Sequence, residues 1–229
     1  MPKPSLTYCA SLVRTHDHDR YLCTLFAPAP VREAWFALFA FNHELATIAE
    51  IASEEMIGFM RFAWWREVLD EIYNGSAVRR HPVAGALAQA VVTYRLSRGP
   101  MDALLDAREE RLTGAPFAGL PEWEAYFRAT SSGLLELCAL VAGAQPAAAI
   151  DELGIAWGCI GTARMQENSL LMKAAKEHLQ GLREGLPEVF NPFRDTAEFY
   201  LKQLERGKRA EGSFMLPFTL CWQHFSRRF

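Results

Sequence analysis

Long apolar runs are missing from this 229-residue chain, and that absence narrows the class of protein it can be. The first twenty residues, MPKPSLTYCASLVRTHDHDR, hold no apolar stretch of the length that a signal peptide needs. The apolar stretches farther along are shorter than the roughly 20 residues of a membrane-spanning helix. We therefore expect a soluble protein without a signal peptide or transmembrane segment, and at most peripheral to a membrane.

Paired cysteines are missing as well. The chain has five scattered cysteines and no C-x-x-C pair, with the thiols at Cys9, Cys23, Cys138, Cys159 and Cys221. An odd, scattered set favours small buried thiols in a reducing compartment over disulfides or a zinc site.

An excess of charge of either sign is also missing. The net charge of −3 is close to balance, so nothing indicates a surface for a polyanion, and nucleic acid is not expected as a partner. The G-x-S-x-G, P-loop and dinucleotide-binding motifs do not occur, so the enzyme classes that depend on them find no support.

The apolar residues that are present follow helical periods. Residues 31–52 are apolar almost all round, which is typical of a helix in the middle of a bundle. Residues 54–73 predict an amphipathic helix. Its apolar face is expected to consist of Met56, Phe59, Met60, Ala63, Trp64, Val68 and Ile72. Further helices are expected at 82–95, 100–112, 121–142, 147–182, 194–208 and 213–227. No linker is long or polar enough to divide the chain, so the sequence predicts one all-α domain over 1–229.

Two polar stretches could suggest metal sites, but simpler roles are favoured. Alternating residues of the HDHD run at 16–19 can chelate only in an extended chain, so Asp17 or Asp19 is expected to cap a helix that starts near Arg20. The acidic residues of the DALLDAREERL run at 102–112 are interleaved with arginines. That pattern favours an ion-paired helix face.

Residues 31–75, VREAWFALFAFNHELATIAEIASEEMIGFMRFAWWREVLDEIYNG, resemble the first core helices of the squalene/phytoene synthase family. That family reads roughly Y-A-F-C-R-x-x-D-D-x-x-D and then R-x-x-W-W-R-x-x-L, and this chain matches it with AF at 40–41 and RFAWWR at 61–66. The likeness is good from about residue 16 to 164 and much weaker after that. The resemblance implies a single helical bundle of the isoprenoid synthase type.

Within the family, the run FNHELA at 41–46 is similar to one branch in particular. That branch includes a mitochondrial complex I assembly factor and its bacterial counterparts, and it carries FNxELA where the synthases carry their first aspartate cluster. The resemblance implies a protein client, such as a respiratory complex subunit, and a cytoplasmic location of the bacterial type, at most peripheral to the inner membrane.

The family's first metal-binding cluster is not matched. Aligned on the two helices, its aspartates fall on Ala46, Thr47 and Glu50. Ionisation of a prenyl diphosphate needs magnesium held between the leaving group and protein carboxylates. Alanine and threonine cannot supply them, so the sequence predicts that this cluster is degraded.

The second cluster, N-x-x-R-D-x-x-x-D in the family, falls on GTARMQENS at 161–169. Arg164 matches, while the two aspartates fall on Met165 and Ser169, and Glu167 is offset by about half a turn. With both clusters altered, we expect no resident cofactor and a non-catalytic scaffold or lipid-binding protein. The alternative is a divergent magnesium-dependent prenyltransferase that uses Glu50, Glu54 or Glu167 with Arg164.

Two apolar regions carry further hypotheses. A bundle of this type could keep a cavity for an isoprenoid lipid or quinone tail, or it could be a filled core. The candidate lining residues are Phe36, Phe39, Phe41, Phe59, Met60 and Trp64. The aromatic and basic segment 213–229 suits peripheral contact with a membrane, although core packing would explain it equally well.

Overall fold

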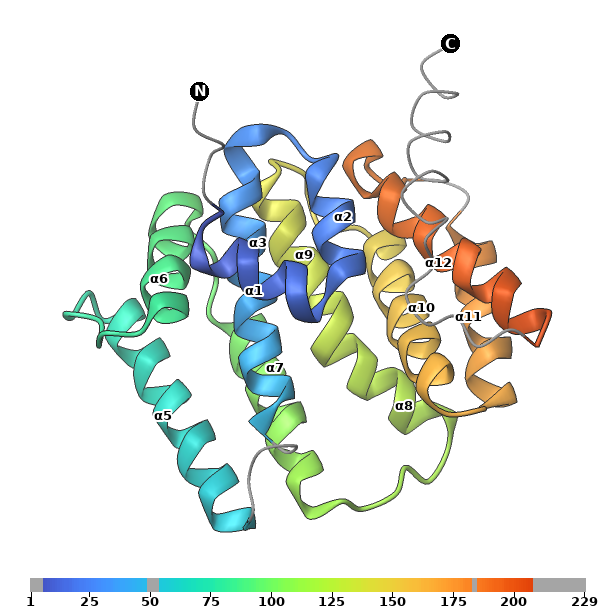
Figure 1. Cartoon of the computed structure of the whole chain (residues 1–229), viewed down its shortest axis with the longest axis horizontal. Coiled ribbons are helices and arrows are strands. Elements are labelled where there is room, and N and C mark those ends of the chain that lie inside the picture. Colours follow the sequence, from blue (N-terminus) through green and yellow to red (C-terminus); the bar gives the residue numbers. More distant parts are fainter. Residues whose placement is uncertain (1–5, 49–53, 183–184, 208–229) are drawn as a thin grey trace. The chain divides into compact units, whose positions relative to one another are not determined.

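The computed structural model describes residues 6–48, 54–182 and 185–207, and over these ranges the chain is helical with no strand. It forms two compact units (Figure 1). The first unit comprises Met1–Pro116 with Leu137–Gly143, and the second comprises Phe117–Glu136 with Ala144–Phe229. The expected all-α class is confirmed. The expectation of one domain over 1–229 stays a prediction.

The first unit is built around one central helix. Its elements are α1 (Tyr8–His16), α2 (His18–Leu25), α3 (Ala29–Ala46), α5 (Glu55–Tyr73), α6 (Pro82–Tyr94), α7 (Gly99–Glu110) and the short 3₁₀ helix η1 (Arg111–Thr113). Helix α3 contacts α1, α2, α6 and α7. Every side chain from Ala34 to Asn42 is buried, as expected for a helix that is apolar on all sides.

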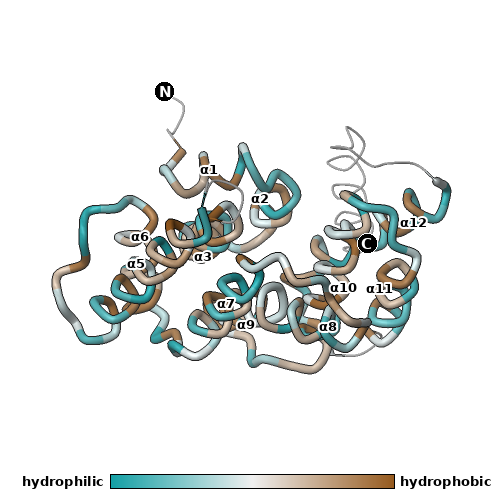
Figure 2. Tube along the Cα trace, turned by 90° about the horizontal axis from the view of Figure 1, so that it is seen from below, coloured by the Kyte–Doolittle hydropathy of each residue, from teal (hydrophilic) through white to brown (hydrophobic). Residues whose placement is uncertain are grey.

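Helix α5 buries a face that coincides only in part with the predicted one, because Val68 and Ile72 are buried as expected and the rest of the predicted face is not. The buried stripe is Gly58, Phe62, Trp65, Val68, Leu69 and Ile72. Met56, Phe59 and Met60, expected on that face, are exposed at 67%, 37% and 66%. Apolar and polar residues are mixed along α5 (Figure 2), so two apolar stripes are available, and the close contact at Gly58 favours burial of the stripe that contains it. A Cβ at Gly58 would lie 2.8 Å from Leu112 of η1.

The HDHD run forms a helix junction, as expected. Asp17 ends α1 and caps α2, with one carboxylate oxygen accepting from the Arg20 amide at 3.3 Å and the other from Arg20 Nη1 at 2.6 Å. The capping role is therefore confirmed for Asp17, although α2 begins at His18 and not at Arg20. Helix α1 is not among the helices expected from the sequence, and its start is marked by Thr7, whose hydroxyl accepts from the Ala10 amide.

The second unit packs around α10 (Ala148–Met165). Its other elements are α8 (Leu120–Phe127), the π-helical turn η2 (Arg128–Ser132), α11 (Ser169–Gly181), η3 (Glu188–Phe190) and α12 (Asn191–Glu205). Helix α9 (Gly133–Val141) begins in this unit and ends in the first. The expected single helix over 147–182 is wrong, because α10 ends at Met165 and α11 starts at Ser169. Asn168 makes the new start, with its side-chain oxygen accepting from the Leu171 amide at 3.1 Å.

Four of the five cysteines, Cys9, Cys23, Cys138 and Cys159, are free and buried, as expected for small buried thiols. Cys221 lies outside the described residues. Burial is the main cause that raises the thiol pKa of Cys9 to about 11 and that of Cys159 to about 12. Burial also raises the pKa of Cys138. These thiols are therefore protonated at neutral pH and poor nucleophiles.

Glu136 of α9 makes the stability of the second unit depend on pH. Burial raises the pKa of its carboxyl, and the negative charge of Asp151 raises it further. Between the ordinary glutamate pKa, about 4.3, and the raised one, the folded state binds more protons than the unfolded state, so stability falls as pH rises. We expect Glu136→Gln to be more stable than the wild type at pH 7 by less than about 1 kcal/mol, after solvent screening of a half-buried group. Urea unfolding at pH 4 and pH 7 checks this, and a difference that does not shrink at pH 4 would contradict it.

Candidate functional site

The positions aligned with the first aspartate cluster lie at the end of α3. Ala46 is the last residue of that helix and Thr47 is its C-cap. The Thr47 hydroxyl lies 3.1 Å from the carbonyl oxygens of His43 and Glu44 and donates back to the helix. Glu50 lies outside the described residues. The two described positions therefore offer no carboxylate at this helix end.

The positions aligned with the second cluster are separated by the break between α10 and α11. Met165, the last residue of α10, is 86% exposed, and Ser169 is the first residue of α11. Residues four apart share one helix face only when the helix runs through both of them. Glu167 lies in the connecting turn and is exposed, while the Arg164 guanidinium lies 3.7 Å from the centre of the Tyr200 ring. This stretch does not present two groups on one helix face.

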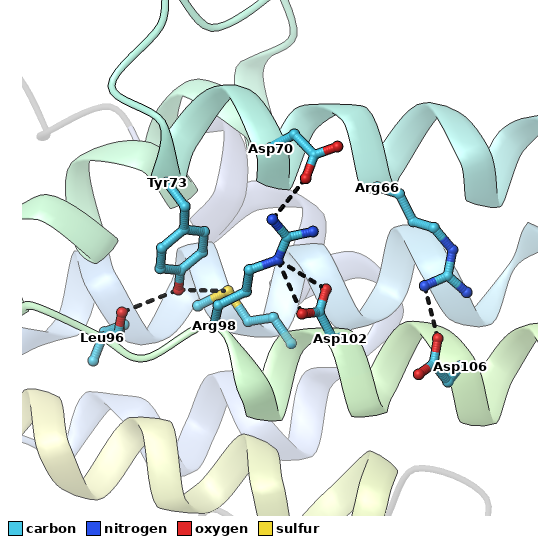
Figure 3. A network of polar contacts seen from close by, with 8 residues as sticks. Arg66, Asp70, Tyr73, Leu96, Arg98, Asp102 and Asp106 are labelled. Carbon is cyan, nitrogen blue, oxygen red and sulfur yellow. Dashed lines mark hydrogen bonds and ion pairs between the residues drawn. The ribbon is translucent and has the colours of Figure 1, made fainter.

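The acidic stripe of α7 is ion-paired, as expected, and its arginine partners are Arg98, the N-cap of α7, and Arg66 of α5. Arg98 joins Asp70 of α5, at 2.6 Å, to Asp102 of α7, at 2.9 Å (Figure 3). One turn farther along, Arg66 contacts Asp106, at 2.7 Å, and Glu109. Burial lowers the pKa of the Arg66 guanidinium, but its hydrogen bonds to Glu109 and Asp106 together outweigh burial and raise it. Hydrogen bonds to Asp70 and Asp102 raise the pKa of Arg98. The stripe therefore ties α5 to α7.

Asn42, within the FNHELA run, has a structural role that the analysis of the sequence missed. Its side chain is 5% exposed, and its Oδ1 accepts from Arg108 Nη2 at 3.3 Å, which links α3 to α7. The signal was present in the run itself, because a polar residue inside a fully apolar helix requires a hydrogen-bond partner.

The residues proposed to line a lipid cavity lie in two different environments. Phe36, Phe39 and Phe41 are buried at 3% exposure or less. Phe36 stacks on Tyr21 with ring centres 5.5 Å apart, and Phe41 meets Trp65 edge-on at 5.2 Å. Trp64 is half-buried, and Phe59 and Met60 lie on the surface of α5. The three phenylalanines are thus core residues of the first unit, and the segment 213–229 lies outside the described residues.

A polar cluster in the second unit holds three helices together. The ring of His178 on α11 places Nδ1 at 2.5 Å from Glu152 of α10 and Nε2 at 3.3 Å from Glu124 of α8. Among the described residues, no group of three or more His, Cys, Asp or Glu side chains is arranged to hold a metal ion. We read the cluster as a link between helices.

A cavity of about 450 Å³ opens between α1, α3 and α6 in the first unit. Its lining is mostly apolar and includes Cys9, Ala34, Ala86 and Ala90. Glu33 also lines it, and the Thr7 hydroxyl donates to the Glu33 carboxylate at 2.8 Å. None of the six residues proposed for a lipid cavity lines this one. This cavity was not predicted from the sequence, although the alanine-rich stretch after Pro82 indicates small side chains on α6.

Within the described ranges, no helix is both long and apolar enough to cross a membrane.

Comparisons with known proteins place the chain in a family. The model of the squalene/phytoene synthase family matches residues 13–167. The protein named NADH dehydrogenase (ubiquinone) complex I, assembly factor 6, from Bos taurus is 38% identical over 136 residues, which cover 59% of this chain and 40% of that protein. Its Homo sapiens counterpart is 37% identical over 136 residues, with the same coverage, and the Drosophila melanogaster homolog is 34% identical over 143 residues, covering 60% and 42%. The alignment thus spans about two-fifths of the length of these curated relatives.

Solved structures share the fold. A squalene synthase from Alicyclobacillus acidocaldarius superposes with a TM-score of 0.71 at 16% identity, covering 87% of this chain and 92% of that one. A dehydrosqualene synthase solved with a ligand gives a TM-score of 0.74 at 13% identity, covering 97% and 96%. At these identities the likeness establishes the isoprenoid synthase fold alone.

Proposed function

The chain belongs to the squalene/phytoene synthase family, and on that premise we propose that it acts through contacts with a protein, as a complex I assembly factor-like scaffold, and does not condense prenyl diphosphates. The relatives named as complex I assembly factors support a client among the subunits of a respiratory complex. We also propose that the chain acts at the surface of the inner membrane, on the cytoplasmic side in a bacterium.

The proposal that the chain is not catalytic rests on the side chains at the positions aligned with the family's two aspartate clusters. Ala46 and Thr47 end α3 without a carboxylate, and Met165 and Ser169 lie on separate helices. Magnesium in diphosphate chemistry is held by hard oxygen ligands, usually carboxylates. A chain without them at these positions has no group there to draw charge from a leaving diphosphate. We therefore propose that no magnesium cofactor is needed.

The first test of this function is diphosphate release. Purified full-length chain is incubated with farnesyl or geranylgeranyl diphosphate, with and without magnesium, beside a family synthase as positive control. We expect no release above the protein-free rate. Magnesium-dependent release that disappears in Glu50→Gln or Glu167→Gln would overturn the proposal and support the divergent prenyltransferase.

The second test concerns the client. Cells of the source organism that lack this chain are expected to contain less assembled complex I, measured as NADH dehydrogenase activity in native gels, and the wild-type chain should restore it. Normal complex I in the deletion strain would contradict the assembly role. An isoprenoid lipid that co-purifies with the chain would then favour the lipid-binding alternative.

A further inference from the structure

The cavity between α1, α3 and α6 is hollow because its floor consists of small side chains. Ala34 comes from α3, Ala86 and Ala90 come from α6, and the Cys9 thiol comes from α1. Two polar contacts hold the helices at this spacing. Thr7 donates to Glu33, and the Tyr94 hydroxyl donates to the Pro30 carbonyl at 3.1 Å. The cavity is thus a feature of packed helices.

The lining of this cavity carries charge of one sign only. Glu33 is its single ionisable residue of the Asp, Glu, Lys, Arg and His types. One carboxylate oxygen, Oε2, accepts from the Thr7 hydroxyl, and in the described part of the chain no basic side chain pairs with Glu33. A carboxylate beside an apolar floor that no described basic side chain neutralises complements a positive group carried on an apolar stem.

Two tyrosines add to this complementarity. Tyr8 of α1, which is 53% exposed, and Tyr94 of α6 both line the cavity. An ammonium or guanidinium group is attracted to the face of an aromatic ring, and arginine uses such contacts often. The rim residues Thr7, Glu33 and Thr93 are exposed, so a side chain from another protein can enter from solvent.

We propose that this cavity binds a lysine or arginine side chain presented by a protein partner, with the aliphatic stem on the alanine floor and the positive group at Glu33. The inference rests on the proposed function, because that function supplies a protein partner. The site uses the N-terminal half of α3, whereas the aligned metal positions Ala46 and Thr47 lie at the other end of that helix.

The test follows the floor methyl groups by NMR. Full-length chain with ¹³C-labelled alanine methyl groups is titrated with the peptide acetyl-Gly-Arg-Gly-amide, with the same peptide carrying neutral citrulline, and with free butylguanidinium. We expect saturable shifts of Ala34, Ala86 and Ala90 with the arginine peptide. Because an exposed charge pair is worth up to about 1 kcal/mol, the citrulline peptide should bind about fivefold more weakly.

Variants distinguish the site from general attraction to an acidic protein. Glu33→Gln should weaken arginine-peptide binding by about fivefold, while Glu110→Gln, an exposed acid of α7 outside the cavity, should not change it. Ala86→Leu should abolish the shifts of Ala34 and Ala90 by filling the cavity. Equal binding of the citrulline peptide, or an unchanged affinity in Glu33→Gln, would overturn the inference.

The remaining outcomes separate this site from the proposed function. Shifts with butylguanidinium but none with the peptide would mean that the cavity takes a free cation, and would overturn the inference of a protein side chain. Peptide binding in a chain whose deletion leaves complex I intact would keep the site and remove the assembly role. A complex I defect in the deletion strain, together with no peptide binding, would support the assembly role and overturn the inference of this site.

Discussion

Gly154→Ala is expected to destabilise the second unit by about 3 kcal/mol, although alanine is normally the better helix former. Gly154 lies on α10 where that helix meets the π-helical turn η2. A Cβ at this position would lie 2.3 Å from Ser132 Cα and 2.6 Å from Ser132 N. These are backbone atoms and cannot rotate away, so the two elements would have to separate. The hydrogen bond from Ser132 Oγ to the Asp151 carbonyl, at 2.8 Å, would be strained as well.

Urea unfolding followed by circular dichroism and by tryptophan fluorescence measures this loss, and the same helix provides the control. Gly161 also lies on α10, but a Cβ there would meet nothing within 4 Å. Gly161→Ala should therefore stabilise the protein by about 0.5–1 kcal/mol, because alanine loses less backbone entropy in a helix. Equal effects of the two substitutions would contradict the close approach of α10 and η2.

Trp35→Ala is expected to cost about 3–5 kcal/mol and to loosen the first unit. Trp35 is the largest fully buried side chain in the described part of the chain, at 0% exposure. Its ring meets Phe39 edge-on, with centres 6.4 Å apart. Its Nε1 donates to the Cys138 carbonyl at 2.9 Å, which connects residues far apart in the sequence. Removing the ring opens a cavity that α3, packed on several helices, cannot collapse to fill.

Two further variants serve as comparisons for Trp35→Ala, one at the same position and one at a half-buried tryptophan. Trp35→Phe keeps one aromatic ring and removes both the donor and the volume of the pyrrole ring, so it should cost less than Trp35→Ala, about 1–3 kcal/mol. Trp64→Phe, at a half-buried position whose ring lies 5.3 Å from the Arg79 guanidinium, should cost less than about 1 kcal/mol. Chemical unfolding of the three variants measures how much stability each one loses. A loss at Trp64 as large as that of Trp35→Ala would contradict the assignment of α3 as the centre of the unit.

Helix α5 was predicted from its own residues, but the face that it buries was not. The sequence predicted the helix and nearly its bounds, 54–73 against Glu55–Tyr73. It did not predict which stripe is buried, because residues 56, 59, 60 and 63 and residues 58, 62, 65 and 69 are both spaced at about one helical turn. Glycine at 58, which allows Leu112 to approach, favours the second stripe. Gly58 and Leu112 are 54 residues apart in the sequence, so the residues around Gly58 do not indicate their contact.

The sequence by itself determined the all-α class, the central position of α3, the cap at Asp17, the ion-paired stripe of α7 and the likeness to the squalene/phytoene synthase family. These follow from periodicity, capping chemistry and local motifs, which neighbouring residues encode. Only the tertiary structure decided which stripe of α5 is buried, the link from Asn42 to Arg108, and the cavity beside Glu33. Each of these depends on which helices meet and how closely, because side chains distant in sequence compete for the same contacts.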